Sequence, residues 1–248
     1  MATEKTLEGK VALITGGVRR LGKGMALAFA RDGASVVINA RSSRDEAEKA
    51  AKEVEATGAK AMVHIADIRK EGEVKAMIDA IIAKFGRLDI LVNNASVRGE
   101  TPFTEMSYEE WRGVLDVVLD GAFFCSRAAL PHMVKNKFGR IINLGGVSSH
   151  LGTPHRAHVG VAKTGMVGLT RSLAAEFAPH GITVNCIAPG RIGGQRSATS
   201  GAGIGHAPPV GREGTFEDVA DVARLLVQPA SGYITGQTIH INGGIYLP

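Results

Sequence analysis

Apolar runs rich in β-branched residues alternate with amphipathic helical segments along most of this chain of 248 residues. Runs such as KVALITG, SVVINA and LDILVNNA are almost continuously apolar, which is typical of strands covered on both faces. Segments such as RDEAEKAAKEVEATG lie between them, and their apolar residues recur at three and four spacings before a closing glycine. The alternation predicts an α/β fold, a doubly wound parallel sheet of about seven strands with helices on both faces.

No linker or internal repeat divides the sequence, and a chain of this length suits one large α/β domain. We therefore expect residues 1–248 to form a single domain. The long stretch without a helix or strand pattern is residues 190–214, GRIGGQRSATSGAGIGHAPPVGREG. Loops of this length and composition are usually functional, and we predict a lid over a substrate site there.

A formal net charge of +5 and a pI near 9.3 are compatible with an anionic partner. The basic residues are scattered, without the runs or interleaved aromatics typical of nucleic-acid binding, so an anionic small molecule is the expected ligand. Cys125 and Cys186 are far apart and fit no metal motif, so no disulfide or metal is predicted. No stretch approaches the roughly 18 apolar residues of a membrane span and the chain begins without an apolar signal region, which favours a cytoplasmic protein without membrane contact.

A glycine-rich turn, LITGGVRRLGKG, follows the first predicted strand and opens the first predicted helix. In this position, backbone N–H groups and a helix N-terminus can bind a pyrophosphate. The alternative is a plain strand-to-helix turn. The predicted dinucleotide contacts in this turn are Gly16, Arg19, Arg20, Leu21 and Gly22.

The end of the second predicted strand selects between the two nicotinamide dinucleotides. A free ribose 2′-hydroxyl favours a carboxylate there, whereas a 2′-phosphate favours cationic side chains. The segment INARSS supplies Arg41 and Ser42 and no acid, and Arg19 lies in the glycine-rich turn. NADP(H) is therefore the predicted cofactor. The alternative for Arg41 is a surface position at the start of the next helix.

From Lys10 to Gly244 the chain resembles the short-chain dehydrogenase/reductase family, in particular its ketoacyl-reductase and pteridine-reductase members. The glycine-rich turn is similar to the family motif TGxxxGxG, with Arg20 at the middle glycine as in the TGxxxRxG variant of pteridine-reductase-like members. The motifs ADI, NNAS, PGRI and GQTIHINGG follow in the family's order. The resemblance implies a Rossmann fold in which Asp67 faces the adenine amino group. The further cofactor contacts that it implies are Ile68, Asn93, Ala95, Lys163, Pro189, Gly190 and Ile192.

The resemblance also implies a catalytic set of asparagine, serine, tyrosine and lysine. In the family, the tyrosine protonates the carbonyl oxygen, the serine orients that oxygen, the lysine holds the nicotinamide ribose, and the asparagine anchors a proton-relay water. The segments DVVLDG, INLGGVSS and HVGVAK place Val118, Gly146, Val159 and Lys163 at the matching positions. Three of the four groups are therefore predicted to be absent. Ordinary ketone reduction should be very slow, because both the acid and the oxygen-orienting donor are missing.

Other side chains near Lys163 are candidates to replace the missing acid. Arg156 lies seven residues before Lys163, where enoyl-reductase relatives carry their tyrosine, and a guanidinium there can hold an enolate or a substrate carboxylate. Histidines at 150, 155 and 158 are expected to cluster close by, and His206 falls in the predicted lid. The alternative for each is a surface or packing position. The predicted catalytic residues are Lys163, Arg156, His155 and His158.

The sequence alone leaves three functions. The first, which we favour because the cofactor motifs and Lys163 persist, is an NADP(H)-dependent oxidoreductase with an atypical active site that reduces an activated C=C or C=N bond. The second is a redox-neutral isomerase, lyase or hydrolase that uses histidine and arginine in the same pocket. The third is a non-catalytic nucleotide-binding subunit. The resemblance further implies a homotetramer or homodimer built on long helices at residues 107–134 and 156–179.

Overall fold

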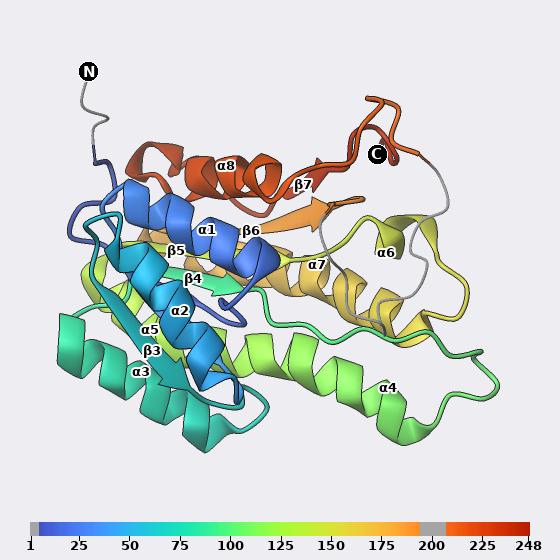
Figure 1. Ribbon diagram of the computed structural model, residues 1–248, viewed down its shortest axis with the longest axis horizontal. Coiled ribbons are helices and arrows are strands. Elements are labelled where there is room, and N and C mark those ends of the chain that lie inside the picture. Colours follow the sequence, from blue (N-terminus) through green and yellow to red (C-terminus); the bar gives the residue numbers. More distant parts are fainter. Residues whose placement is uncertain (1–4, 194–206) are drawn as a thin grey trace.

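A computed structural model describes residues 5–193 and 207–248 of the chain. Its strands are β1 (Val11–Ile14), β2 (Ser35–Ala40), β3 (Ala61–Ile65), β4 (Ile90–Asn93), β5 (Gly139–Leu144), β6 (Ile182–Pro189) and β7 (Thr238–Ile241). All seven are parallel and form one sheet in the order β3-β2-β1-β4-β5-β6-β7 (Figure 1). The predicted doubly wound parallel sheet is confirmed.

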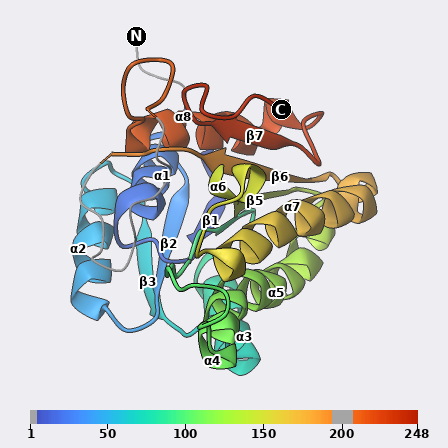
Figure 2. The ribbon, with the colours of Figure 1, turned by 90° about the vertical axis from the view of Figure 1, so that its right-hand side faces the viewer.

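Helices cover both faces of this sheet. They are α1 (Arg20–Arg31), α2 (Arg44–Glu55), α3 (Glu71–Phe85), α4 (Tyr108–Leu115), α5 (Gly121–Asn136), α6 (Ser148–Leu151), α7 (Ala157–Phe177) and α8 (Phe216–Val227). One face carries α1, α2 and α8, and the other carries α3, α5 and α7 (Figure 2). Within the described ranges, none of the helices has the length and hydrophobicity needed to cross a bilayer.

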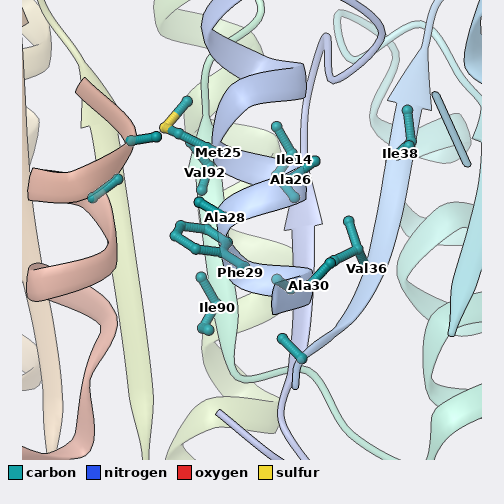
Figure 3. Close-up of a cluster of buried hydrophobic side chains, with 14 of the residues drawn as sticks. Ile14, Met25, Ala26, Ala28, Phe29, Ala30, Val36, Ile38, Ile90 and Val92 are labelled. Atoms are coloured by element: carbon teal, nitrogen blue, oxygen red, sulfur yellow. The ribbon is translucent and has the colours of Figure 1, made fainter. Parts of the chain in front are cut away.

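The two helix layers explain the apolar character of the strand sequences. β1, β4 and β5 are buried along their whole lengths, whereas the edge strands β3 and β7 are mostly half-buried. One apolar cluster fills the space between α1 and the sheet (Figure 3). Met25 and Phe29, one helical turn apart, pack there with Ile14 and Ile90, and all four are fully buried. Burial of each such side chain stabilises the fold by roughly 1.5–3 kcal/mol.

The order of the strands reverses direction at β1. β1 lies between β2 and β4, so the chain builds outward to β3 first and then continues on the other side from β4. In open α/β sheets, ligands bind outside the carboxyl ends of the strands where this reversal occurs. The glycine-rich turn after β1 and the irregular segment after β4 meet at this point.

One of the two long helices expected from the sequence is interrupted. In the region 107–134, α4 ends at Leu115, a π-helical turn η1 (Asp116–Asp120) follows, and α5 begins at Gly121. A π-turn inserts an extra residue and changes which side chains face the sheet. The second helix, expected at 156–179, is the continuous α7.

The predicted lid at residues 190–214 is described at its two ends. Residues 194–206, which include His206, lie outside the described residues. At the ends, Ile192 and Gly214 form an isolated parallel bridge, and Arg191 forms an ion pair of 2.9 Å with Glu213. The role of a lid stays a prediction.

A buried carboxylate at the amino-terminal edge of the sheet gives a test of the fold. Asp89 is fully buried and accepts hydrogen bonds from Val11 N (2.9 Å) and from the Arg87 guanidinium (2.6 and 2.7 Å). Asp89→Ala should lower the free energy of unfolding by about 3 kcal/mol, because both donors lose their acceptor. Asp79→Ala, which removes an exposed ion pair with Lys75, should change it by less than about 0.5 kcal/mol. Urea unfolding measures both values, and similar losses in the two variants would contradict this account.

Candidate active site

Two polar side chains fasten the glycine-rich turn to the end of β4. The buried hydroxyl of Thr15 donates to Val92 O (3.2 Å) and accepts from the backbone N–H groups of Asn94 (3.0 Å) and Ala95 (3.1 Å). In return, Asn94 Nδ2 donates to the carbonyl oxygens of Thr15 (2.8 Å) and Gly16 (3.0 Å). These bonds hold the turn at the carboxyl edge of the sheet.

Gly16 and Gly22 are required by the geometry of the turn. Gly16 has φ +61°, in the left-handed region that favours glycine. A Cβ on Gly22 would lie 2.6 Å from Gly16 O and 2.7 Å from Asn94 Nδ2, so the turn has no space for a side chain there. The bare backbone and the adjoining N-terminus of α1 have the form of a pyrophosphate cradle, and they fit a dinucleotide.

Arg20 takes the backbone conformation that a glycine usually supplies. Its φ is +49°, and it begins α1. The guanidinium lies 5.2 Å from the centroid of the Phe216 ring, a cation–π contact. Arg19 before it is exposed, and Leu21 after it packs against the core. The turn therefore keeps its course although its middle glycine is replaced.

The residues expected at the adenosine end of the cofactor come together after β2 and β3. Arg41 and Ser42 follow β2 and are exposed, and Asp67 and Ile68 follow β3 and are buried. A hydrogen-bonded guanidinium, that of Arg69, holds the pKa of Asp67 below its usual range. The structure thus places these predicted contacts at one edge, and their roles toward a nucleotide stay predictions.

Asn93, at the end of β4, belongs to a chain of buried polar groups. Its Nδ2 donates to Asn143 Oδ1 (2.8 Å) and Ser126 Oγ (3.1 Å), and Asn143 Nδ2 donates to Thr170 Oγ1 (2.9 Å). The Oδ1 atom of Asn93 is buried and has no hydrogen-bond partner among the described residues. A buried acceptor without a donor costs about 1–3 kcal/mol, so a ligand hydroxyl that donates here is favoured. A ribose fits this requirement.

The end of β6 and the residues that follow it lie on the other side of β1 from the adenosine end. Pro189 ends β6, Gly190 and Ile192 follow, and Ile192 is 5% exposed. A Cβ on Gly190 would lie 2.7 Å from the Cα of Asn242, so only glycine fits against this neighbour. Asn242 Nδ2 in turn donates to Tyr246 O (2.9 Å), which ties the last residues of the chain to this point.

Lys163 lies on the buried face of α7. Its Nζ donates to Leu144 O at the end of β5, at 2.7 Å. Burial lowers the pKa of Lys163 to about 7, and the nearby charge of Arg98 acts in the same direction. Near neutral pH the amine is therefore present in both protonation states, and it can give or take a proton.

The positions matched to asparagine, serine and tyrosine carry no hydrogen-bonding side chain. Val118, in the π-helical turn, and Val159, in α7, belong to one buried apolar cluster with Met166. Their exposed fractions are 2% and 4%. A Cβ on Gly146 would meet only Ser148 Oγ, at 3.9 Å, among the described atoms within 4 Å. A small side chain would therefore fit at position 146.

Arg156 is the residue that precedes α7, and its side chain is buried, like that of Lys163. It is buried at the N-cap with φ −129° and ψ 30°, one residue before the helix begins at Ala157. Its carbonyl oxygen accepts from Gly160 N (2.8 Å), the first bond of the helix. Arg156 Nε lies 2.8 Å from Glu100 Oε1, so Glu100 competes with any substrate anion. A catalytic role for Arg156 stays a prediction.

The three histidines expected to cluster have separate surroundings. His155 is exposed with φ +60°. His158 is buried, its Nε2 would lie 3.1 Å from a Cβ on Gly99, and burial lowers its pKa. The ring of His150 contacts His240, with 4.6 Å between centroids. His150 therefore packs against the β7 side of the site, whereas His155 O accepts from Thr101 N in the segment after β4. A shared catalytic role of these histidines stays a prediction.

Two residues at the site were not anticipated from sequence patterns. Asn94 fastens the glycine-rich turn, and its place beside Asn93 in the NNAS motif was a usable signal. Glu100 partners Arg156 from the irregular segment at residues 94–107, where no periodicity indicated a contact. Each of these two residues contacts a part of the site that is distant from it in the sequence.

Comparison with known proteins identifies the family. A family model described as enoyl-(acyl carrier protein) reductase matches residues 17–246, and the chain belongs to this family of short-chain oxidoreductases. The 3-oxoacyl-[acyl-carrier-protein] reductase FabG of Staphylococcus aureus is 38% identical over 242 residues, which are 96% of this chain and 98% of the relative. The 3-oxoacyl-[acyl-carrier-protein] reductase of Synechocystis sp. is 39% identical over 243 residues, 97% and 98% of the two chains.

Two solved structures share the fold over nearly the whole chain. A protein from Sinorhizobium meliloti described as a short-chain alcohol dehydrogenase has a TM-score of 0.87 and 34% identity, and the match covers 96% of each chain. An NAD+-bound xylitol dehydrogenase has a TM-score of 0.89 and 28% identity, and the match covers 96% of this chain and 99% of the neighbour.

The buried amine of Lys163 predicts a specific pH dependence of stability. Its pKa is about 7 in the folded chain and 10.5 for an ordinary lysine, so unfolding takes up a proton between these values and the free energy of unfolding rises with pH in that window. Relative to Lys163→Met, wild type should gain on the order of 2 kcal/mol between pH 7 and about pH 9. Urea unfolding at both pH values measures this difference. In the exposed control Lys75→Met, the free energy of unfolding should change with pH as it does in wild type. If Lys163→Met also showed the same pH dependence as wild type, the burial of a neutral amine would be disproved.

Proposed function

We propose that this chain is an NADP(H)-dependent short-chain reductase that reduces an activated C=C or C=N bond at a site without a hydroxyl acid. The observation that carries the proposal is the combination of a dinucleotide cradle with apolar surroundings at the catalytic positions. Val159 stands where the resemblance expects the tyrosine, Gly146 where it expects the serine, and Val118 where it expects the asparagine. Lys163 alone keeps the expected residue type.

Three features support the cofactor. The glycine-rich turn has no space for a side chain at Gly22, which suits a close approach of a pyrophosphate. Asn93 Oδ1 is a buried acceptor that a ribose hydroxyl would satisfy. Arg41 and the exposed Arg19 provide cations where a 2′-phosphate would lie, and no acid follows β2 directly. When bound, NADPH supplies the hydride.

The missing hydroxyl groups favour an activated double bond over a ketone. Reduction of a ketone places negative charge on one oxygen, and loss of the acid and of an oxyanion donor costs about a hundred- to ten-thousand-fold and a hundred- to a thousand-fold in rate. In a C=C bond conjugated to a carbonyl, hydride adds to the β-carbon, the charge is delocalised, and a proton adds to the α-carbon. An iminium carbon needs no acid when it accepts hydride. The description of the matching family as an enoyl reductase agrees with the first of these reactions.

Lys163 is the residue that we assign to proton transfer. Its pKa, lowered by burial to about 7, provides an ammonium that can release a proton near neutral pH. Its hydrogen bond to Leu144 O holds the amine at the carboxyl end of β5, the edge that the cradle also occupies. Val159, one helical turn before Lys163, adds no competing polar group.

A non-catalytic nucleotide-binding subunit is the second candidate. The observation in its favour is that Arg156 is paired with Glu100 and that His155 is exposed. The same observation gives no support to a redox-neutral enzyme that would use histidine and arginine together. Substrate-dependent oxidation of NADPH distinguishes the reductase from the non-catalytic binding subunit.

We also propose that copies of the chain assemble through α5 and α7, as a homodimer or homotetramer. Phe123 on α5 is 45% exposed and Val161 on α7 is 47% exposed, and large apolar side chains at this exposure favour a covered surface. Sedimentation of the purified chain measures the assembly, and a monomer at micromolar concentration would contradict it.

The reaction can be followed through the near-ultraviolet absorbance of the reduced nicotinamide. With wild type and NADPH, we expect oxidation in the presence of an enone or an imine and little oxidation with simple ketones. If no enone, imine or pterin leads to oxidation of NADPH, the proposed reductase activity is overturned. The non-catalytic nucleotide-binding subunit is then the candidate that remains.

Restoring the missing groups tests why ketones are poor substrates. The double variant Gly146→Ser/Val159→Tyr should reduce ketones at least about a hundredfold faster than wild type, because it regains an acid and an oxygen-orienting hydroxyl. The matched control adds Lys163→Met to the same two substitutions and should lose this gain. If the double variant binds NADPH without any gain, the position of the nicotinamide rather than the missing hydroxyls limits the rate.

A further inference from the structure

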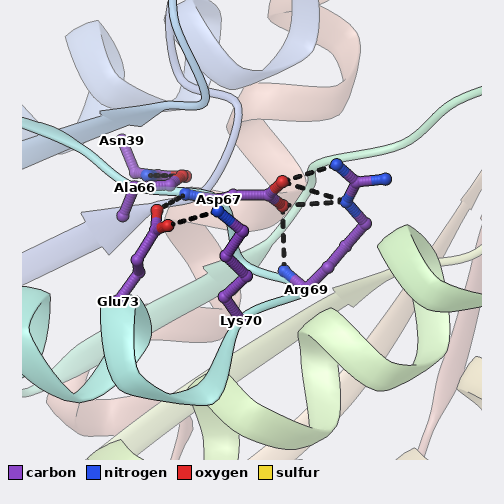
Figure 4. A network of polar contacts seen from close by, with 6 residues as sticks. All are labelled: Asn39, Ala66, Asp67, Arg69, Lys70 and Glu73. Carbon is purple, nitrogen blue, oxygen red and sulfur yellow. Dashed lines mark hydrogen bonds and ion pairs between the residues drawn. The ribbon is translucent and has the colours of Figure 1, made fainter.

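Asp67 is held by the guanidinium of Arg69, two residues further along the chain. Its carboxylate accepts from Arg69 Nε at 2.9 Å and from Arg69 Nη2 at 2.5 Å, and the backbone N–H of Arg69 adds a bond of 3.1 Å (Figure 4). The Asp67 side chain is 12% exposed and that of Arg69 is 38% exposed. In the first turn of α3, Glu73 pairs with Lys70 at 2.9 Å. Asp67 and Glu73 therefore each have their own cation.

Arg41 lies close to this turn without a bonded partner. Ala40, the last residue of β2, is in register with Ile65, the last residue of β3, so Arg41 and Asp67 leave adjacent strands at the same edge. Arg41 makes no hydrogen bond or ion pair with any residue that the structure describes. Its charge is nevertheless near enough to lower the pKa of Asp67.

An ionised Asp67 without a partner would attract Arg41. Opposite charges near a protein surface attract over this range, and an exposed arginine side chain can turn toward a neighbouring carboxylate. Arg41 paired in this way would not be available to a phosphate, and an uncompensated carboxylate nearby would also repel one. Arg69 prevents both effects because it cancels the charge of Asp67 in place.

We propose that Arg69 is a specificity-determining residue: its pairing with Asp67 leaves Arg41 available for the 2′-phosphate of NADP(H). This role rests on the proposed function, in which the chain binds that cofactor. Arg69 acts through the two other side chains, so it is a positioning residue for the discrimination between NADPH and NADH.

The test measures the dissociation constants of NADPH and NADH by calorimetry, with wild type, Arg69→Gln, Lys70→Gln and Asp67→Asn/Arg69→Gln. In Arg69→Gln, the preference for NADPH over NADH should fall about tenfold. Lys70→Gln removes the same charge from the same turn but leaves the Asp67 pair intact, so it should change the preference less than about twofold. The double variant removes the carboxylate that Arg69 neutralises, and its preference should return to that of wild type.

Thermal unfolding of each variant checks that the substitution leaves the fold intact. An unchanged preference in Arg69→Gln, an equal fall in Lys70→Gln, or a double variant that stays as low as Arg69→Gln would each overturn the role of Arg69 while the proposed function stands. A wild type that binds neither nucleotide overturns the proposed function, and the role of Arg69 with it.

Discussion

The interaction on which the rest of the structure depends is the contact between the Thr15 hydroxyl and the residues that follow β4. It joins the ends of two adjacent central strands. The Thr15 hydroxyl accepts from the N–H group of Ala95 and shares that of Asn94 with Val92 O. With Asn94 bonded back to the turn, the glycine-rich segment is held at the carboxyl edge of the sheet, where α1 begins. The form of this turn thus follows from a few hydrogen bonds between residues distant in the sequence.

The two ends of the same sheet edge differ in their chemistry. After β2 and β3 the edge is charged, and the pairing of Asp67 with Arg69 sets how much of that charge faces a ligand. Beside α7 the edge is apolar, because Val118 and Val159 belong to a hydrocarbon cluster and Lys163 is the buried ionisable group next to it. This division agrees with the proposal that the chain holds a dinucleotide at an active site without a hydroxyl acid.

Local sequence patterns predicted the fold well, because continuous apolar runs and helical periodicity depend on layers that recur along the whole chain. The glycine-rich turn was predictable because its glycines lie close together in the sequence, although contacts with Asn94 and Ala95, distant in the sequence, hold the turn in place. The partner of Arg156, the ring contact of His150 with His240 and the π-helical turn around Val118 were not predictable. Each depends on contacts between segments far apart in the sequence, or on one inserted residue that leaves the apolar pattern almost unchanged.

The central claim is that this chain binds NADPH but lacks the acid that ketone reduction needs. The most direct measurement mixes the wild-type complex with an excess of a 3-oxoacyl thioester in a single turnover and follows the absorbance of the bound reduced nicotinamide. We expect NADPH to bind and its absorbance to persist, or to decay at least about a hundredfold more slowly than in the Gly146→Ser/Val159→Tyr variant. Rapid loss of the absorbance in wild type, at a rate that the restored serine and tyrosine do not increase, would contradict the account.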